Sequence, residues 1–166
     1  MYQRILVPID GSITSNRGLD EAIKLAKLMG ASLRLIHAAD ALTFSTGFEP
    51  YGVYHDQVIP QMRATGHRIL KKAEARAEGE GVKADSVLRE DLGTQVSDTV
   101  IAQAKEWKAD LIVIGTHGRR GIGRWLMGSD AEQIVRKAPV PVLLVRASDQ
   151  DLKAELSFAT AEVGVS

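Results

Sequence analysis

The sequence predicts an α/β protein whose open, five-stranded parallel sheet is covered by helices on both faces. Three observations support this fold class. Short apolar, β-branched runs alternate along the chain with longer segments of helical periodicity. The run at 111–114 is apolar throughout, which is typical of a strand that is buried on both faces. Strict alternation of strands and helices favours parallel strands joined by helical connections.

The first elements have clear boundaries. A strand at 4–9 ends at Asp10-Gly11-Ser12, which are turn and capping residues. Apolar residues at helical spacing then predict a helix, which Gly30 ends. A second strand covers 32–38. These three elements form the first β-α-β unit of the predicted sheet.

The next segment, at 39–57, has no clear periodicity. It contains two phenylalanines, two tyrosines, glycine and proline, and we expect a long, partly ordered loop. A helix follows at about 62–79, and Gly66 makes its middle the weakest part of the prediction. The remaining elements alternate as before and are expected at 82–89 (strand), 96–107 (helix), 111–114 (strand), 131–138 (helix) and 140–145 (strand).

One domain is expected, because 166 residues are about the size of one ordinary domain. It should cover 1–147. The tail at 148–166 has no partner in the pattern, and we expect it to be mobile or loosely docked. Hydrophobic residues make up 45% and charged residues 25%, which is near the average of globular proteins and excludes a disordered or fibrous chain.

Charge and residue usage exclude several classes of function. Lysine plus arginine equal aspartate plus glutamate at 21 each, so no net charge attracts nucleic acid or an acidic membrane. Cysteine is absent, which excludes a disulfide scaffold, a thiolate zinc site and a cysteine nucleophile. No apolar run approaches the roughly 18 to 20 residues that cross a bilayer, and the N-terminus has no signal-peptide pattern. We therefore expect a cytoplasmic protein.

The segment after the fourth strand is the strongest candidate for a ligand site. Gly115-Thr116-His117-Gly118 is followed after nine residues by Gly128-Ser129 at the start of a helix. Glycines allow close approach of the backbone, and a helix start offers amide donors and a positive dipole end, which together suit phosphate. Arg119, Arg120 and Arg124 add local positive charge. The alternative is an ordinary turn, a capping box of Ser129 with Glu132, and solvated arginines.

Asp10 is the second candidate. If the first and fourth strands are neighbours where the strand order reverses, its carboxylate faces the same crevice as Gly115. It could hold a ribose hydroxyl or a magnesium ion. The alternative is an aspartate that forms a turn and caps the first helix.

These residues resemble the ATP-binding branch of the universal stress protein family. The run from Gly115 to Ser129 matches that branch's glycine motif, G-x2-G-x9-G-[S/T], without a gap. The opening Ile5-Leu6-Val7-Pro8-Ile9-Asp10-Gly11-Ser12 is similar to the family's first strand, and Pro139-Val140-Pro141-Val142-Leu143-Leu144-Val145 is similar to its last. The resemblance covers residues 1 to about 147 and implies a Rossmann-like sheet of the adenine nucleotide alpha hydrolase type.

The resemblance also implies the residues that bind the nucleotide. Pro8, Ile9 and Asp10 would line the adenosine end, and Ala38 would touch the base. The phosphates would be faced by Gly115, His117, Gly118, Arg119, Gly128, Ser129 and the backbone amides of Asp130 and Ala131. The chain differs from the family at one important position. Many family members carry a small apolar or hydroxyl residue where this chain has Asp130, and the carboxylate there is expected to weaken the binding of triphosphate.

The expected function is that of a nucleotide-responsive stress protein that binds ATP, ADP or AMP, with magnesium possible at Asp10. A hydrogen bond to phosphate explains His117 without proton transfer, so no catalytic residue is predicted. Two alternatives stay open: a slow ATPase or other nucleotide-using enzyme, and a structural interaction protein with a vestigial site. A dinucleotide-binding domain is discounted, because no complete G-x-G-x-x-G loop follows the first strand.

Partners and metal sites complete the expectations. His37, His55 and His67 show no metal-ligand spacing, and core or surface roles are expected for them. The last strand should lie at a sheet edge, where unpaired backbone groups need a partner. The apolar side chains of Val140, Val142 and Val145 would favour contact with a second strand there. The family resemblance implies pairing with the same strand of a second subunit, and thus a homodimer without nucleic acid or membrane as partners.

Overall fold

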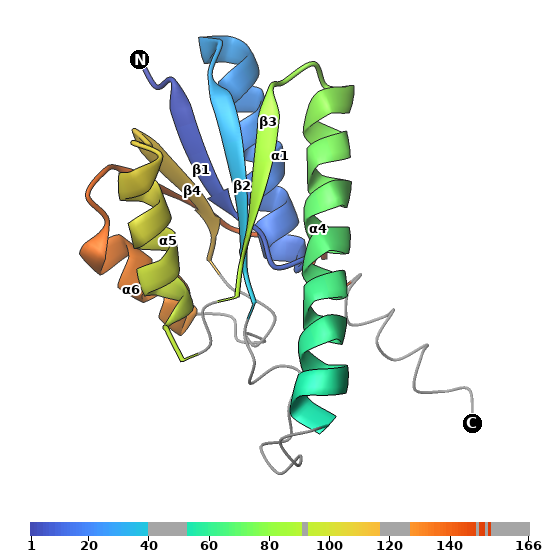
Figure 1. The fold of residues 1–166 in the computed structure, drawn as a ribbon. Helices are drawn as coiled ribbons and strands as arrows, with labels where there is room; N and C mark the ends of the chain where they lie inside the picture. The colour runs from blue at the N-terminus through green and yellow to red at the C-terminus, as the bar shows by residue number, and fades with distance from the viewer. Residues whose placement is uncertain (40–52, 91–92, 117–126, 149, 152, 154–166) are drawn as a thin grey trace.

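The computed structural model describes residues 1–39, 53–90, 93–116, 127–148, 150–151 and 153. In this part of the chain, five parallel strands form one sheet with the order β3-β2-β1-β4-β5, as Figure 1 shows. The strands are β1 (Arg4–Pro8), β2 (Ser32–Ala38), β3 (Ala84–Arg89), β4 (Leu111–Gly115) and β5 (Val142–Val145). The predicted fold class is confirmed.

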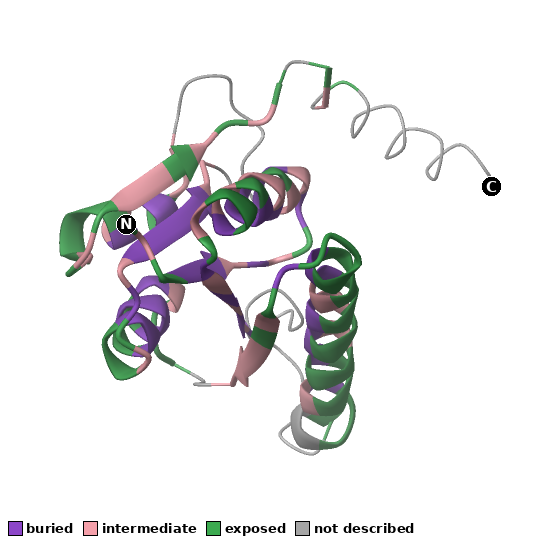
Figure 2. Cartoon of the chain, turned by 90° about the horizontal axis from the view of Figure 1, so that it is seen from above, coloured by how far each residue is buried: buried purple, intermediate pink, exposed green. Residues whose placement is uncertain are grey.

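Helices cover both faces of the sheet. Those of the described residues are α1 (Ile13–Met29), α4 (Ile59–Gly79), α5 (Val96–Glu106) and α6 (Ser129–Lys137), and a π-helical turn, η1 (Tyr54–Val58), precedes α4. Side chains of β1 alternate between two cores, because Ile5 and Val7 pack with α1 and α4 whereas Leu6 packs with α5 and α6. Figure 2 shows the buried residues in the central strands and on the inner sides of the helices.

Both ends of α1 follow from its sequence. Ser12 has extended backbone, and its hydroxyl accepts a hydrogen bond from the Ser15 amide at 3.1 Å. At the other end Gly30 has a φ of 68°, a left-handed conformation that favours glycine, and its amide donates to the Ala26 carbonyl. The predicted glycine stop is therefore confirmed.

α4 begins earlier than the sequence predicts. η1 occupies the last part of the segment expected to be a loop, and 40–52 lie outside the described residues. Gly66, the expected weak point, is buried in a continuous helix. A Cβ at Gly66 would lie 2.6 Å from Leu88 Cδ1 and 2.9 Å from His37 Cδ2. The glycine thus lets α4 approach β2 and β3 closely.

β5 forms one edge of the sheet, as predicted, but it begins at Val142 rather than at Val140. Pro141 precedes it, and proline has no amide to donate to a neighbouring strand. The Pro141 carbonyl still accepts a hydrogen bond from the Ile112 amide at 3.0 Å. The regular strand therefore starts one residue after the proline.

The tail expected to be loosely docked is anchored at its start. Ser148 and Asp151 bond reciprocally, with the Asp151 amide 3.2 Å from Ser148 Oγ and the Ser148 amide 2.9 Å from Asp151 Oδ2. Arg17 of α1 donates from Nε to Asp151 Oδ2 at 3.0 Å and from Nη2 to Oδ1. Residues 154–166 lie outside the described residues.

α1 lies unusually close to β4, because glycines occupy both sides of the contact. A Cβ at Gly115 would lie 2.5 Å from the Thr14 carbonyl oxygen and 2.9 Å from the Ser15 amide nitrogen. A Cβ at Gly18 of α1 would lie 3.3 Å from the Gly115 amide nitrogen. Backbone therefore packs on backbone where the first helix begins and the fourth strand ends.

We predict that Gly115→Ala lowers the free energy of unfolding by about 1–3 kcal/mol, because the added methyl group meets backbone atoms that can yield only if α1 shifts. Gly79→Ala is the matched control, since a Cβ there has no neighbour within 4 Å. Chemical denaturation measures both variants. Equal stability of Gly115→Ala and wild type would show that α1 is not held against β4 at this point.

Candidate functional site

The carboxyl ends of β1, β2 and β4 lie together at one end of the sheet, the lower end in Figure 1. We call this end of the sheet, where the strands finish, the carboxyl edge. β1 pairs with β2 on one side, where Pro8 lies opposite Ile36, and with β4 on the other, where Leu6 lies opposite Ile112. The strand order therefore reverses at β1. Ligands of open parallel sheets bind at such a point. The first and fourth strands are thus neighbours, which was the condition for Asp10 to face the same crevice as Gly115.

Asp10 directly follows β1 and is held in a turn by its own side chain. Its Oδ1 accepts a hydrogen bond from the Ser12 amide at 2.8 Å, and Gly11 between them has a φ of 81°. The Asp10 amide donates to Ser15 Oγ at 3.4 Å. The cap of α1 is Ser12 rather than Asp10, so only the turn-forming part of the alternative reading is right. The carboxylate is half-buried at the carboxyl edge.

The other adenosine-side residues lie beside Asp10 on β1 and β2. Pro8 and Ala38 are half-buried at the ends of their strands. Ile9 differs, because its side chain is 2% exposed and belongs to the core under α1 and α4. Its amide donates to the Ile36 carbonyl at 2.8 Å. Ile9 therefore lies at the site, but its side chain packs in the core and its amide pairs with β2.

β4 and α6 are joined at the same edge. The Thr116 amide donates to the Val145 carbonyl at 3.0 Å, and the Gly128 amide donates to the Thr116 carbonyl at 2.9 Å. Gly115, which ends β4, and Gly128, which precedes α6, are therefore held near each other although the chain between them is long. The first turn of α6 thus starts at the carboxyl end of β4, the strand that pairs with β1, which Asp10 follows.

The capping box expected as the alternative at Ser129 is wrong. Gly128 is the N-cap of α6, and its carbonyl accepts the first intrahelical bond from the Glu132 amide at 2.9 Å. No side chain caps the helix there. Asp130 is consequently the second helical residue, not the first, and it is exposed together with Ser129, whereas Ala131 is buried. The sequence could not distinguish Gly128 from Ser129 because both are good N-caps.

The middle of the glycine motif lies outside the described residues. His117, Gly118 and Arg119 belong to this part, as do Arg120 and Arg124. Their expected contacts with phosphate therefore stay predictions. What the structure describes is the position of the two ends of the motif, at β4 and at α6.

The histidines and acidic residues of the described part form no metal cluster of three or more potential ligands. His37 is buried, with Nδ1 2.7 Å from the Ile9 carbonyl oxygen, and His67 is exposed on α4. These are the core and surface roles expected for them, and the side chain of His55 is outside the described part. Sequence reasoning did not see that His37 lies next to the candidate site, since only the sheet register brings it to Ile9.

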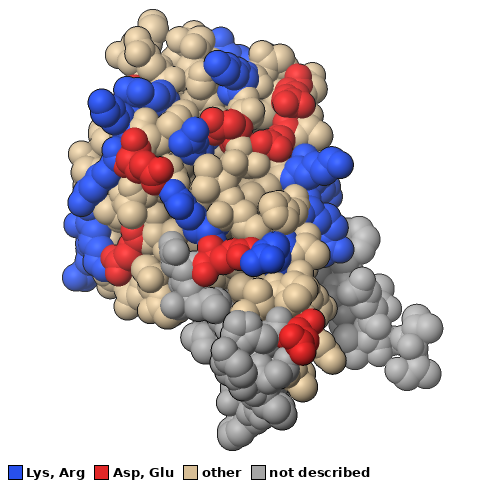
Figure 3. Space-filling view, viewed as in Figure 1, with Lys and Arg blue, Asp and Glu red and all other residues tan. Residues whose placement is uncertain are grey.

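Charges at the surface are mixed. On the face in Figure 3, basic and acidic side chains are interspersed, as expected from their equal numbers. Several form ion pairs between elements, such as Arg63 of α4 with Glu90 at 2.6 Å and Lys137 of α6 with Asp98 of α5 at 2.7 Å. The hydrogen bond from Arg63 holds the pKa of Glu90 below its usual range. In the described residues no helix is long and apolar enough to cross a bilayer.

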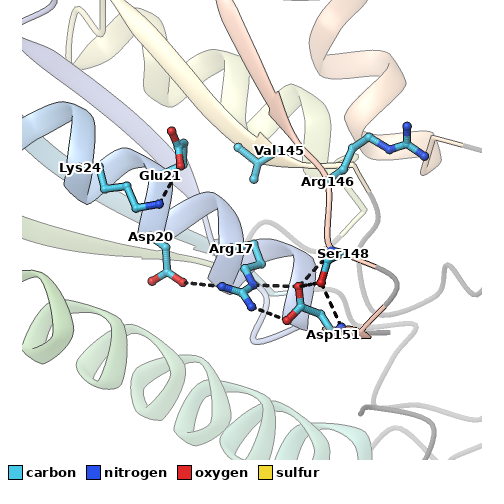
Figure 4. A pocket seen from close by; sticks show the side chains of 8 residues that line it. All are labelled: Arg17, Asp20, Glu21, Lys24, Val145, Arg146, Ser148 and Asp151. Carbon is cyan, nitrogen blue, oxygen red and sulfur yellow. Dashed lines mark hydrogen bonds and ion pairs between the residues drawn. The ribbon is translucent and has the colours of Figure 1, made fainter. Parts of the chain in front are cut away.

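An open cleft of about 300 Å³ lies elsewhere, between α1 and the chain after β5 (Figure 4). Its charges compensate one another. Arg17 lies between Asp20 and Asp151, and Lys24 pairs with Glu21 at 3.3 Å. The cleft is lined by Arg17, Asp20, Glu21, Lys24, Val145, Arg146, Ser148 and Asp151.

This cleft is a docking place for the start of the tail rather than the predicted nucleotide site. The hydrogen bond from Arg17 holds the pKa of Asp151 far below its usual range, and two bonds from Ser148 act in the same direction. The lowered pKa favours the ionised form of the Asp151 carboxylate, which is the form that bonds to Arg17 of α1. Of the residues predicted to bind nucleotide, none that the structure describes lines the cleft.

Comparison with known proteins agrees with the fold. The model of the universal stress protein family matches residues 1–146. A universal stress protein of Methanocaldococcus jannaschii is 34% identical over 146 residues, which are 88% of this chain and 83% of that protein.

Two solved structures are similar to this chain over nearly their whole length. A protein of the same family from Burkholderia pseudomallei is 33% identical with a TM-score of 0.70, and the match covers 88% of this chain and 97% of that one. A universal stress protein solved in complex with cAMP is 28% identical with a TM-score of 0.63, covering 89% and 98% of the two chains. The chain therefore belongs to the universal stress protein family.

Proposed function

We propose that this protein binds an adenine nucleotide at the carboxyl edge of its sheet and acts as a nucleotide-responsive module of the stress response. One observation carries the proposal: the two ends of the glycine motif are held together at the carboxyl end of β4, which pairs with the strand that precedes Asp10, where the strand order reverses. The Gly128 amide, 2.9 Å from the Thr116 carbonyl oxygen, makes this link. Parallel sheets bind their ligands at this position, and a helix start there suits a phosphate.

A relative supports the ligand class. The universal stress protein solved with cAMP shares the fold of this chain at 28% identity, and cAMP is an adenine nucleotide. By analogy with the family, Pro8, Ile9 and Asp10 would contact the adenosine, and Ala38 would contact its base. The phosphates would lie toward the motif and the first amides of α6, those of Ser129, Asp130 and Ala131.

The ligand within this class is proposed to be ATP, ADP or AMP. A magnesium ion, if one binds, would be shared between Asp10 and phosphate oxygens, because carboxylate and phosphate oxygens are the ligands that magnesium prefers. The proposed mechanism is regulation by binding: a nucleotide that prefers one arrangement of the protein shifts its population toward that arrangement. We propose the cytoplasm as the compartment. An assay of ATP turnover distinguishes this mechanism from that of a slow ATPase.

The first test is direct binding. We expect purified protein to carry adenine nucleotide, detectable by mass spectrometry, and to bind ATP and AMP in calorimetry after that nucleotide is removed. Gly118→Val should abolish binding with little change in far-ultraviolet circular dichroism, because the family motif needs close backbone approach there. Binding of neither nucleotide by the wild type would refute the proposal and leave the structural interaction protein as the better reading.

Asp130 provides a sharper prediction. Its exposed carboxylate in the first turn of α6 is favoured by the helix dipole by roughly 0.3–1 kcal/mol. A phosphate bound at the positive N-terminal end of α6 would be repelled by the negative charge of Asp130. Asp130→Val should therefore unfold at a slightly lower temperature without ligand and bind ATP more tightly, most clearly at low magnesium, with a smaller gain for AMP.

Calorimetry of both proteins with and without magnesium checks this expectation. Glu78→Val is the control for net charge, because Glu78 is exposed near the far end of α4. It should leave both affinities unchanged. Equal ATP affinity of Asp130→Val and wild type at all magnesium concentrations would show that the carboxylate does not act on the phosphates.

We further propose that the protein forms a homodimer through β5. This strand has β4 on one side, and the other side is the edge of the sheet. Val142 and Val145 are half-buried and Leu144 is 37% exposed, so a second copy would cover apolar side chains and unpaired backbone groups together. Pairing of the same strand from two subunits gives a symmetric, isologous contact.

Sedimentation measures this contact. We expect the wild type to sediment as a dimer and Leu144→Glu to shift toward monomer, because a charge would be buried at the symmetric edge. Leu28→Glu is the matched control, since Leu28 is 81% exposed on α1. A wild-type mass of one chain at every concentration would contradict the dimer.

A further inference from the structure

A buried histidine joins the two strand ends that the proposed function assigns to adenosine. His37 lies on β2, is 5% exposed, and places Nδ1 2.7 Å from the carbonyl oxygen of Ile9, just after β1. Its side chain faces the layer of α1 and α4, near Gly66. The ring is therefore inside the protein, beside the site rather than in it.

The geometry determines which nitrogen of the ring carries a proton. A carbonyl oxygen only accepts hydrogen bonds, so Nδ1 of His37 must be the donor. In the neutral ring, Nε2 is then without a hydrogen. This tautomer is assigned from the partner of Nδ1, and it can be measured independently of any ligand.

Two hydrogen bonds hold the backbone of Ile9, one at its amide and one at its carbonyl. Its amide donates to the Ile36 carbonyl at 2.8 Å, and its carbonyl accepts from His37. The next residue is Asp10, whose turn depends on the direction in which the chain leaves Ile9. On the other strand, His37 is directly followed by Ala38. One side chain thus ties the segment that carries Asp10 to the segment that carries Ala38.

α4 supports the ring from behind. A Cβ at Gly66 would lie 2.9 Å from His37 Cδ2 and 2.6 Å from Leu88 Cδ1. The end of the leucine side chain can rotate away, but the imidazole is planar and anchored at Ile9. The glycine therefore leaves room for the ring in the orientation that reaches the carbonyl.

We propose that His37 is a positioning residue of the nucleotide site: through its bond to the Ile9 carbonyl it sets the distance between Asp10 and Ala38. This inference rests on the proposed function. The residue does not touch the ligand. It pre-organises the two segments that do, and preorganisation raises affinity because less order must be created on binding.

The test compares two substitutions at His37. Asparagine can present an amide donor close to the place of Nδ1, whereas leucine fills space without a donor. We expect His37→Leu to lose about tenfold or more in ATP and AMP affinity, and His37→Asn to stay within about threefold of wild type, by calorimetry on folded protein. His67→Leu, the same change at an exposed site on α4, should have no effect.

The outcomes separate this inference from the proposed function. If the wild type binds no adenine nucleotide, both fail. If the wild type binds and a folded His37→Leu binds equally well, only this inference fails. Equal losses in His37→Asn and His37→Leu would also overturn it, because the donor would then be irrelevant.

Two further measurements cover the case in which His37→Leu does not fold. Long-range ¹⁵N–¹H correlation spectra of histidine-labelled wild type should show Nδ1 protonated, and protonation at Nε2 alone would overturn the inference. Gly66→Ala should weaken nucleotide binding without contact with the site, because its methyl group crowds the ring. Gly79→Ala, on the same helix with no neighbour within 4 Å, should bind as wild type does.

Discussion

The backbone of the first turn of α1 lies against the end of β4 with no side chain between them. Gly18 and Gly115 make this possible, and a methyl group at position 115 would lie 2.5 Å from the Thr14 carbonyl oxygen. Because the contact fixes α1 relative to β4, it also fixes the turn at Asp10, which leads into α1. The contact therefore places the Asp10 turn next to the carboxyl end of β4, while the hydrogen bond from Gly128 to Thr116 holds the start of α6 at that end.

Gly66 and Gly115 therefore have the same role in packing, but they pack against different kinds of atoms. Each lets a helix come closer to the sheet than a side chain would allow, and each close approach lies next to the candidate site. At 115 the neighbour is backbone, so the requirement is rigid. At 66 the neighbours are the ends of two side chains, so part of the strain can relax. The motif glycine at 115 thus has a packing role whatever it does for a ligand.

Surface ion pairs complete the arrangement without dominating its stability. Arg76 of α4 and Arg17 both contact Asp20 of α1, and Arg17 also holds Asp151 of the tail. Exposed pairs of this kind contribute little to stability, because water screens them and because ordering two long side chains costs entropy. Their effect is to orient, because they connect α1 with α4 and with the start of the tail.

Local patterns in the sequence determined the alternation of strands and helices and the glycine stop of α1, because hydrophobic periodicity and backbone preferences act over a few residues. They also placed Asp10 and Gly115 at strand ends and Gly128 at the start of a helix. The edge position of β5 was expected because β5 is the last strand in the chain. Only the tertiary structure decided that Gly128 caps α6, that α4 begins earlier, that Asp151 docks on Arg17 and that His37 bonds to Ile9. Each of these depends on which of several locally equivalent options packing and sheet register bring into contact, and that information is distributed over residues far apart in the chain.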